Sequence, residues 1–281
     1  MTGRDAYPTF MTRRRFYAPP SAFSSSRDSV MLATDEARHL RDVLRLKVGD
    51  EVYVFDGAGK EFHCRIEESR RETAQLQVIA EVTPARPESP LSLTLAVALL
   101  KGEKFDLVVQ KSTELGVSRI LPVVTKLADI RLRDESDAAK RVTRWQRIAL
   151  EAAKQSGRAV VPEINAPVTF DSLLQNTGPL QSRNCLLFSE RDGQSLKDAA
   201  NALVRTASVS GQPDAAWPPA HAGGSDITAL VGSEGGWTDE ELDAARQAGW
   251  TIVTLGGRTL RAETAAIAVA TLLQHLAGDL V

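Results

Sequence analysis

The feature that most constrains the fold is a series of short apolar segments, each followed by a stretch with helical periodicity. The segments with strand character are 91–99, 119–124, 184–188, 227–231 and 251–255. The helical stretches between and after them are 103–115, 138–156, 195–204, 239–248 and 262–276. Near-continuously apolar strands that alternate with helices are typical of a parallel sheet covered on both faces, so the sequence predicts an α/β fold for this part of the chain.

The chain before this series has a different pattern. Segments 14–17, 51–55, 60–66 and 74–82 alternate as strands do, and one helix is predicted from Thr34, as its N-cap, to Leu44. Pro84, Pro87 and Pro90 then interrupt any regular structure. The organisation predicted is a disordered leader over 1–12, a small β-rich domain over 13–83, a linker over 84–90 and a second domain over 91–281, with a surface loop at 205–226.

Composition excludes several classes of protein. The 281 residues are 43% hydrophobic and 25% charged, as in ordinary globular proteins. The longest apolar runs, 95–100 and 265–273, are far shorter than the roughly 20 residues that cross a bilayer. The two cysteines are distant in sequence and the four histidines lack ligand spacing. We therefore expect a cytoplasmic protein with no structural metal.

The net charge of −2 hides an uneven distribution. Residues 101–161 contain 13 Lys and Arg against 8 Asp and Glu, a balance of +5, whereas residues 223–281 contain 3 against 8, a balance of −5. Local potential governs the encounter with phosphates, so a basic face that binds nucleic acid is compatible with this chain. Solvated helix faces of opposite sign would give the same counts.

Two glycine-rich segments follow predicted strands. The first, 231–237, leads into Thr238 and Glu241, which form a capping-box pattern at a helix start. The second, 255–265, contains Gly256 and Gly257 with two arginines, Arg258 and Arg261. Both would lie at one edge of the sheet, where α/β proteins bind ligands. Neither has the spacing of a dinucleotide fingerprint or a P-loop, and the similar segment 56–60 lies between two strands, which favours a hairpin turn.

A third candidate closes the long helix 138–156. Lys140, Arg144, Arg147 and Lys154 recur at helical spacing, and the segment 155–158 ends in Arg158. Such a basic stripe is suited to phosphate contact, although a solvated helix face is an equally good reading of the stripe alone.

Taken together, the motifs resemble the SPOUT class of knotted S-adenosylmethionine-dependent RNA methyltransferases. They are most similar to the RsmE-like family, which methylates N3 of a uridine in 16S ribosomal RNA. Residues 15–17, 39–40, 43–45 and 49–50 resemble that family's PUA-like RNA-binding domain. The segments that resemble its catalytic domain are 101–104, 110–111, 114–117, Glu151 with 155–158, and the two glycine-rich segments.

The chain departs from the family pattern at four positions. Ser233 and Gly257 stand where the family usually has proline, Trp237 stands where it has phenylalanine, and Arg38 stands where it has histidine. Because serine and glycine leave the unfolded chain more freedom than proline does, we expect looser cofactor loops.

The resemblance implies a PUA-like β-barrel followed by a SPOUT α/β domain with a mostly parallel sheet and a C-terminal trefoil knot. S-adenosylmethionine would lie bent in the knot, and a homodimer would build the site for 16S ribosomal RNA of the small subunit. The residues expected to hold the cofactor, mainly through their backbones, are Phe188, Ser189, Val231, Gly232, Glu234, Gly235, Leu255, Gly256, Leu260, Arg261 and Thr264.

Methylation at N3 requires loss of the imide proton or stabilisation of the resulting anion. The predicted catalytic residues are Arg158 and Arg261, which would orient the uridine and stabilise its charge, and Glu234, as base or as structural anchor. The residues expected to contact RNA are Arg13, Arg14, Arg15, His39, Arg41, Arg45, Lys101 and Lys104.

Three alternatives stay open on the sequence. The first is a SPOUT methyltransferase that acts on a ribose 2′-hydroxyl or a guanine. The second is a non-catalytic RNA-binding assembly factor that retains the fold. The third is a nucleotide-binding enzyme that uses the glycine loops for phosphate, which the missing P-loop lysine disfavours.

Overall fold

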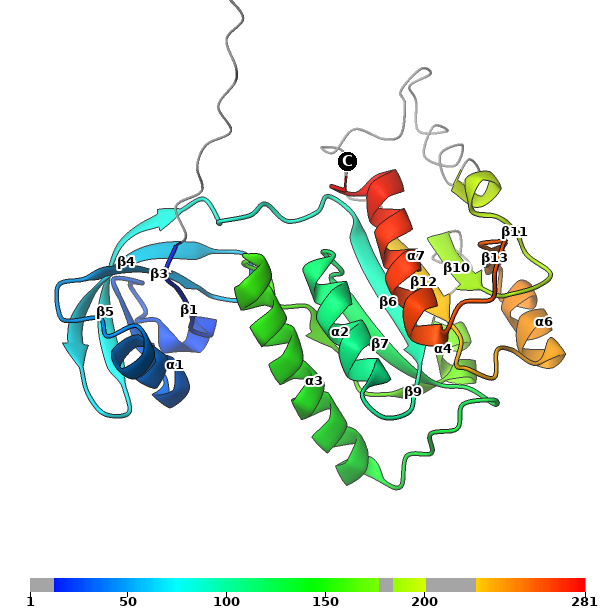
Figure 1. Cartoon of the computed structure of the whole chain (residues 1–281), viewed down its shortest axis with the longest axis horizontal. Coiled ribbons are helices and arrows are strands. Elements are labelled where there is room, and N and C mark those ends of the chain that lie inside the picture. Colours follow the sequence, from blue (N-terminus) through cyan, green and yellow to red (C-terminus); the bar gives the residue numbers. More distant parts are fainter. Residues whose placement is uncertain (1–12, 177–183, 201–225, 281) are drawn as a thin grey trace, which may run out of the picture. The chain divides into compact units, whose positions relative to one another are not determined.

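The computed structural model describes residues 13–176, 184–200 and 226–280 (Figure 1). The predicted leader 1–12 and the predicted loop 205–226, except for Asp226, lie outside these ranges. The chain divides into two compact units. The first comprises Met1–Glu88 and Ala153–Val161, and the second comprises Ser89–Ala152 and Pro162–Val281. The division after Glu88 falls within the segment 84–90, whereas residues 153–161 belong to the first unit and not to the second domain as predicted.

The first unit is built on a curled five-stranded sheet. Its strands are β1 (Arg15–Tyr17), β2 (Ser29–Leu32), β3 (Glu51–Phe55), β4 (Glu61–Ser69) and β5 (Ala74–Val82). Their order is β1-β3-β4-β5-β2, with β1 parallel to β3 and the other pairs antiparallel. A 3-10 turn, η1 (Pro20–Ala22), precedes β2. Alternation buries one side of the strands around Phe16, Leu32, Val52 and Leu76.

Two predictions for this unit need correction. Strand β2 was not predicted, because its four residues are too few to show a clear alternation. The predicted helix 34–44 is α1 (Thr34–Arg38) followed by a π-helical turn, η2 (His39–Val43). Ala33 is the N-cap and not Thr34, since the amide of Ala37 donates to the Ala33 carbonyl at 2.8 Å.

The predicted hairpin turn 56–60 is confirmed, and it also holds the second segment of the unit. The Asp56 amide donates to the Lys60 carbonyl at 3.0 Å, which closes the turn. The Gly59 amide donates to Ala159 O at 3.2 Å, and the Val161 amide to Gly57 O at 3.0 Å. These bonds tie residues 153–161 to the first unit.

The second unit contains an eight-stranded sheet in which every pairing is parallel, as predicted. Its order is β11-β13-β10-β12-β6-β7-β8, and β9 also pairs with β7. The strands are β6 (Ser92–Ala98), β7 (Arg119–Val124), β8 (Glu163–Ile164), β9 (Val168–Thr169), β10 (Cys185–Phe188), β11 (Gln194–Ser195), β12 (Asp226–Val231) and β13 (Thr251–Thr254). Strands β8, β9 and β11 have two residues each, too short for a hydrophobic period to predict.

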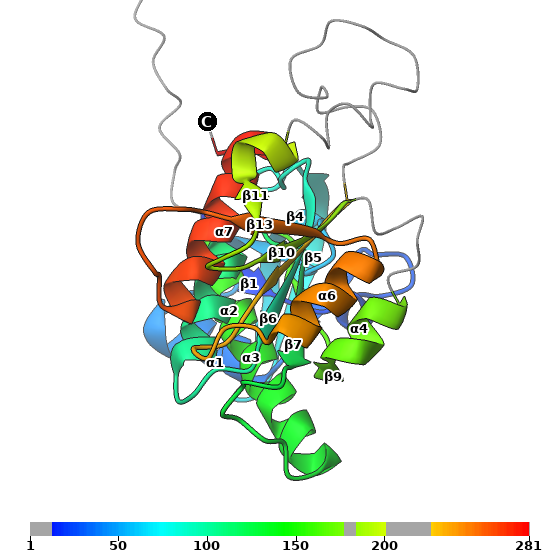
Figure 2. The same cartoon turned by 90° about the vertical axis from the view of Figure 1, so that its right-hand side faces the viewer.

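Helices cover both faces of this sheet (Figure 2). They are α2 (Lys104–Glu114), α3 (Glu135–Ser156), α4 (Phe170–Asn176), α6 (Asp239–Gln247) and α7 (Ala262–Ala277). On one face α2 packs beside α7. On the other, α4 and α6 bury Phe170, Leu242 and Ala245 against a core that includes Trp237 and Trp250. Helix α4 was not predicted. None of the helices that the structure describes combines the length and the hydropathy of a transmembrane segment.

Candidate active site

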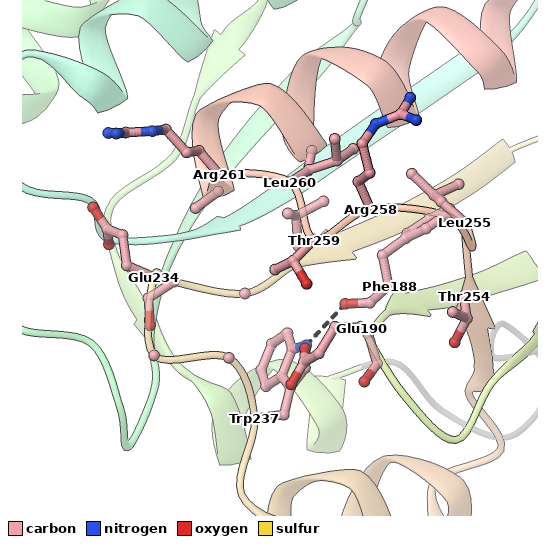
Figure 3. Close-up of a pocket in the computed structure, with 18 of the residues that line it drawn as sticks. Phe188, Glu190, Glu234, Trp237, Thr254, Leu255, Arg258, Thr259, Leu260 and Arg261 are labelled. Carbon is pink, nitrogen blue, oxygen red and sulfur yellow. Dashed lines mark hydrogen bonds between the residues drawn. The ribbon is translucent and has the colours of Figure 1, made fainter.

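Three loops of the second unit surround a cavity of about 630 Å³ (Figure 3). They follow β10, β12 and β13, which are adjacent and parallel, so their carboxyl ends meet at one edge of the sheet. We call residues 232–237 the first glycine loop and residues 256–261 the second glycine loop. The volume lies within the range of about 300–1,000 Å³ typical of small-molecule sites.

The first glycine loop is fixed by its neighbours. Trp237 is buried, and its indole Nε1 donates to the Phe188 carbonyl at the end of β10, at 2.9 Å (Figure 3). A Cβ atom on Gly232 would lie 3.0 Å from the indole ring. A Cβ atom on Gly235 would lie 2.8 Å from the Leu127 carbonyl oxygen. Glycine is therefore required here because the backbone and the indole leave no room for a side chain.

The predicted capping box at the end of this loop is confirmed. The Thr238 hydroxyl accepts from the Glu241 amide at 3.2 Å, and the Glu241 carboxylate accepts from the Thr238 amide at 3.1 Å. The same carboxylate accepts from the Lys126 amide at 2.8 Å and is almost fully buried. Helix α6 thus fixes the direction in which the first glycine loop leaves the cavity.

The second glycine loop is less enclosed. Gly256 and Gly257 both have φ of +75°, and no atom lies within 4 Å of the position of an added Cβ in either case. Glycine is required here by backbone conformation and not by space. The loop carries Arg258, Thr259, Leu260 and Arg261 to the cavity (Figure 3). Neither Arg258 nor Arg261 has a hydrogen-bond or ion-pair partner among the described residues.

The charges around the cavity are mixed. Lys104, at the start of α2, donates from Nζ to the Glu234 carboxylate at 2.6 Å. Burial alone would raise the pKa of Glu234, but the Lys104 hydrogen bond and charge, with a backbone hydrogen bond, hold that pKa below its ordinary value. Glu190 adds a second carboxylate to the lining. A carboxylate with a lowered pKa is a weak base, so this geometry favours the anchor role for Glu234 over the base role.

The structure brings together nearly all of the residues predicted to hold a cofactor. Every one of them lines the cavity except Thr264, which is exposed on the first turn of α7. Lys104 lies here too, although it was predicted to contact RNA. The lining residues outside the predicted cofactor set are Glu190, Ser233, Gly236, Trp237, Thr254, Gly257, Arg258, Thr259, Ala262 and Ala265. Most of them are neighbours of predicted residues, so the motif located the loops but not the full lining.

Arg158, the remaining predicted catalytic residue, is held by an ion pair within its own unit. It belongs to the first unit and is 5% exposed. Its Nη2 and Nε donate to the Glu88 carboxylate at 2.7 and 3.0 Å. Gly157, with φ of +85°, ends α3 and allows the chain to turn there. The sequence pattern could not distinguish this buried ion pair from an exposed basic residue.

Three of the arginines predicted to bind RNA have partners inside the first unit. The Arg15 side chain is 7% exposed and binds the fully buried Glu61 through Nε and Nη2, at 3.2 and 3.3 Å. Arg13 donates to Glu61 and to the Thr83 carbonyl. Arg41 donates to Asp42 and to the carbonyls of residues 70 and 71. Arg13 and Arg15 stabilise the fold, since the buried Glu61 carboxylate needs such partners, whereas the Arg41 pair with Asp42 is at the surface.

The remaining predicted RNA-binding residues are at the surface. Arg14, His39 and Arg45 are exposed in the first unit. Lys101, in the second unit, is exposed and pairs with Asp129 at 2.6 Å.

Metal-binding clusters and reactive thiols are absent from the described residues. They contain no group of three His, Cys, Asp or Glu side chains able to hold a metal ion. Both cysteines are buried free thiols, and burial raises the pKa of Cys64 to about 12 and that of Cys185 to about 11. Such thiols are inert at neutral pH.

Comparison with protein families gives two matches along the chain. Residues 87–274 match the family model described as an RNA methyltransferase domain. Residues 32–79 match the model described as an RNA methyltransferase PUA domain.

Curated relatives cover most of the chain. The ribosomal RNA small subunit methyltransferase E of Synechocystis is 31% identical over 91% of this chain and 75% of the relative. The protein of the same name from Bacillus subtilis is 30% identical over 82% of this chain and 84% of the relative.

Solved structures are similar over nearly the whole chain. Ribosomal RNA small subunit methyltransferase E from Neisseria gonorrhoeae, determined with S-adenosylmethionine, is 33% identical with a TM-score of 0.76, covering 96% of this chain and 100% of that one. A methyltransferase structure from Legionella pneumophila, also with bound cofactor, is 29% identical with a TM-score of 0.77 and the same coverage. With a matching family model over two thirds of its length and these relatives, the chain belongs to the RNA methyltransferase family that carries an N-terminal PUA domain and includes ribosomal RNA small subunit methyltransferase E.

Proposed function

We propose that this protein transfers a methyl group from S-adenosylmethionine to N3 of a uridine in 16S ribosomal RNA of the small subunit. The observation that carries the proposal is the cavity built by three strand-end loops, in a chain of the RNA methyltransferase family. Two similar structures were determined with this cofactor.

The residues of the cavity fit the cofactor. Leu255, Leu260 and Ala265 supply apolar surface for an adenine ring. The glycine loops expose backbone amides and carbonyls that can bind its polar edge. The Ser233 hydroxyl lines the cavity, is buried and has no partner among the described residues, which leaves a hydrogen-bonding group available to a ligand.

S-adenosylmethionine, when bound, supplies an electrophilic methyl group on a sulfonium. The chain must then hold the uridine in line with that methyl and stabilise charge on the ring as the N3 proton leaves. Arg261 is suited to this task because its guanidinium has no protein partner in the described structure and stands at the rim of the cavity. Its backbone, with the rest of the second glycine loop, contributes to the cofactor site.

We assign the other two predicted catalytic residues to supporting roles. Glu234, paired with Lys104 at 2.6 Å, anchors the first glycine loop to the start of α2. Arg158, buried against Glu88, anchors the end of α3 within the first unit. Neither group is then required to touch the reacting ring.

The N3 position lies on the Watson–Crick edge, so the target uridine must be unpaired or extruded. RNA would be held by the first unit through Arg14, His39 and Arg45, and by Lys101 of the second unit. These contacts are mostly to phosphates and position the RNA without reading its sequence.

Three further properties belong to the proposal through the family resemblance. The C-terminal part would be threaded as a trefoil knot, which the parallel order β13-β10-β12 supports. Two copies would form a homodimer that completes the RNA site. The protein would act in the cytoplasm, where ribosomal subunits are assembled.

The deciding experiment measures methyl transfer from labelled S-adenosylmethionine to small-subunit particles from cells that lack this gene, with the modified nucleoside identified by mass spectrometry. We expect 3-methyluridine. Label in another nucleoside would support the methyltransferase activity but contradict uridine as its substrate. Absence of label together with measurable cofactor binding would favour the assembly factor instead.

A further inference from the structure

The two most exposed large apolar side chains among the described residues lie in one short segment of the first unit. Val43 is 67% exposed and Val48 is 63% exposed, and Leu44 between them is 38% exposed. We call residues 43–48 the knuckle. Exposed aliphatic side chains grouped in this way mark interaction sites more often than isolated ones do.

The backbone fixes the knuckle in place. Leu40 and Leu46 are buried in the core of the first unit, and the Leu46 amide donates to the Leu40 carbonyl at 3.1 Å. The Leu44 amide donates to the His39 carbonyl at 3.0 Å, which closes the π-helical turn η2. Beyond the knuckle, the Gly49 amide donates to the Ile66 carbonyl at 2.8 Å. Val43 and Val48 are therefore held outward by a segment that is anchored on both sides.

One residue of the knuckle has an unfavourable backbone conformation. Arg45 has φ of +53°, a region that side chains other than glycine, asparagine and aspartate rarely adopt. Such conformations and π-helical turns persist where the surroundings enforce them, and both are found preferentially at functional sites. The conformation turns Leu46 into the core and leaves the Arg45 side chain exposed.

The knuckle itself carries two exposed cations, and the nearest carboxylate after it, that of Asp50, accepts a hydrogen bond from the Lys47 amide at 2.8 Å. Arg45 and Lys47 are exposed, and neither side chain has a hydrogen-bond or ion-pair partner in the described part of the chain. The nearby Asp42 is neutralised by Arg41, whose Nε lies 2.7 Å from the carboxylate. An aliphatic surface flanked by free cations fits a polyanion that also offers apolar contact.

We propose that the knuckle docks in the minor groove of a double-helical segment of ribosomal RNA. Val43 and Val48 would contact riboses and base edges, while Arg45 and Lys47 would contact the phosphates beside them. This inference rests on the proposed function and specifies how the first unit holds its RNA. The knuckle has no aromatic residue on which an unpaired base could stack, and the RNA minor groove is wide, shallow and lined by sugars.

The test uses the full chain and three labelled probes: an RNA duplex, a DNA duplex of the same sequence, and one of the RNA strands alone. The double variant Val43→Ser with Val48→Ser is expected to weaken RNA duplex binding by about tenfold or more, because it removes the apolar surface that the RNA would cover. Its salt dependence should stay unchanged. The matched control is Ile79→Ser, which alters a 43% exposed side chain on β5 of the same unit and should bind as the unaltered protein does.

Arg45→Gly tests the cation without threatening the fold, because glycine adopts a positive φ readily. We expect an unchanged or higher midpoint of thermal unfolding, weaker RNA binding and a salt slope smaller by about one. Lys60→Ala is the charge control, since Lys60 is exposed in the same unit but already pairs with Glu81 at 2.9 Å.

Several results would overturn the proposal. Duplex binding by the valine double variant that equals that of Ile79→Ser would do so, and so would a loss confined to the single strand or an equal loss on DNA. If the valine double variant binds bare RNA normally but methylates intact particles poorly, the knuckle binds a protein partner and not RNA. If the unaltered protein methylates no RNA while the variants bind the RNA duplex as expected, the proposed function is wrong and the docking surface is still supported.

Discussion

The two glycine loops of the cavity have similar composition but are held in different ways. In the first, an added Cβ at Gly235 would lie 2.8 Å from a backbone oxygen, and Trp237 bonds the loop to the end of β10 at 2.9 Å. In the second, Gly256 and Gly257 are surrounded by open space and are distinguished only by φ of +75°. The first loop is thus closely packed, whereas the second is a turn set by its backbone conformation that carries two arginines without a partner among the described residues.

The difference in packing assigns different roles to the two loops, which their similar glycine patterns in the sequence do not distinguish. A packed loop can hold a ligand with little rearrangement, which favours cofactor binding. An open loop with unpaired cations can adjust to a second ligand and stabilise charge that develops on it. We therefore expect substitutions in the first loop to affect stability and cofactor affinity, and side-chain substitutions in the second to affect turnover.

Arg261→Ala should have the largest effect. Loss of one charge-stabilising donor costs about a hundredfold or more in turnover. We expect kcat to fall by this factor while the cofactor Kd, measured by calorimetry, changes little. Arg258→Ala is the matched control on the same loop. A rise in the cofactor Kd without a fall in kcat would assign the Arg261 side chain to the cofactor.

Gly235→Ala should be the most destabilising single substitution in the first loop. The new methyl group would overlap the Leu127 backbone, which cannot move away as the end of a flexible side chain could. We expect a loss of about 2–3 kcal/mol in the free energy of unfolding. Urea denaturation measures it, and a loss below that of Gly256→Ala would contradict the close packing of the first loop.

Gly256→Ala tests the open loop. Alanine has room there, so the cost is confined to the left-handed backbone conformation, about 1–2 kcal/mol. Gly256→Asn should cost less, because asparagine tolerates this conformation better than alanine. Equal unfolding free energies for the two variants would show that φ is not the constraint.

Trp237→Phe removes the hydrogen bond to the Phe188 carbonyl but keeps an aromatic ring in the core. We expect a loss of about 1 kcal/mol in stability, typical of one hydrogen bond. The cofactor Kd should rise in parallel, because the bond joins two of the three loops. Cys185→Ala, a change in the same core at the start of β10, away from the loops, is the control: it should lower stability without altering the Kd.

Lys104→Met should have the smallest effect on stability, about 0.5 kcal/mol, because the Lys104 and Glu234 side chains are 32% and 29% exposed. The pKa of Glu234 is lowered in the folded protein. Its contribution is therefore present above the unfolded pKa, about 4.3, and is lost as pH falls through the folded value. The Lys104→Met variant should therefore lose less stability than the unaltered protein as the pH falls. Unfolding measured between pH 7 and pH 3 tests the expectation, and identical pH profiles would contradict it.

Much of the fold follows from periodicity. The five long strands and most helices of the second unit were predicted within a few residues, because burial on both faces leaves an apolar signal. The errors fall where that signal is weak. Strands β8, β9 and β11 have two residues each, and no sequence pattern distinguishes the i→i−5 hydrogen bonding of the π-helical turn η2 from that of an α-helix.

The site was predicted loop by loop. Glycine spacing after β12 and β13, with the capping box at Thr238, located two walls of the cavity correctly. Glu190 was missed because nothing local distinguishes a lining residue from any other exposed residue. Gly257 stands where the family usually has proline, but in the structure it has a φ of +75°, which proline cannot adopt. Glycine at this position is therefore required by the backbone conformation.

The sequence by itself determined the class of fold, the parallel sheet, the two glycine loops and the family, because these depend on patterns within short segments. Only the tertiary structure decided which charged residues are free to act. Arg15 and Arg158 read as surface cations in the sequence, yet each is buried against a carboxylate, Glu61 or Glu88, from a distant segment. The physical reason is that a charge is stabilised by whichever opposite charge the fold brings within hydrogen-bonding distance, and no local pattern specifies that partner.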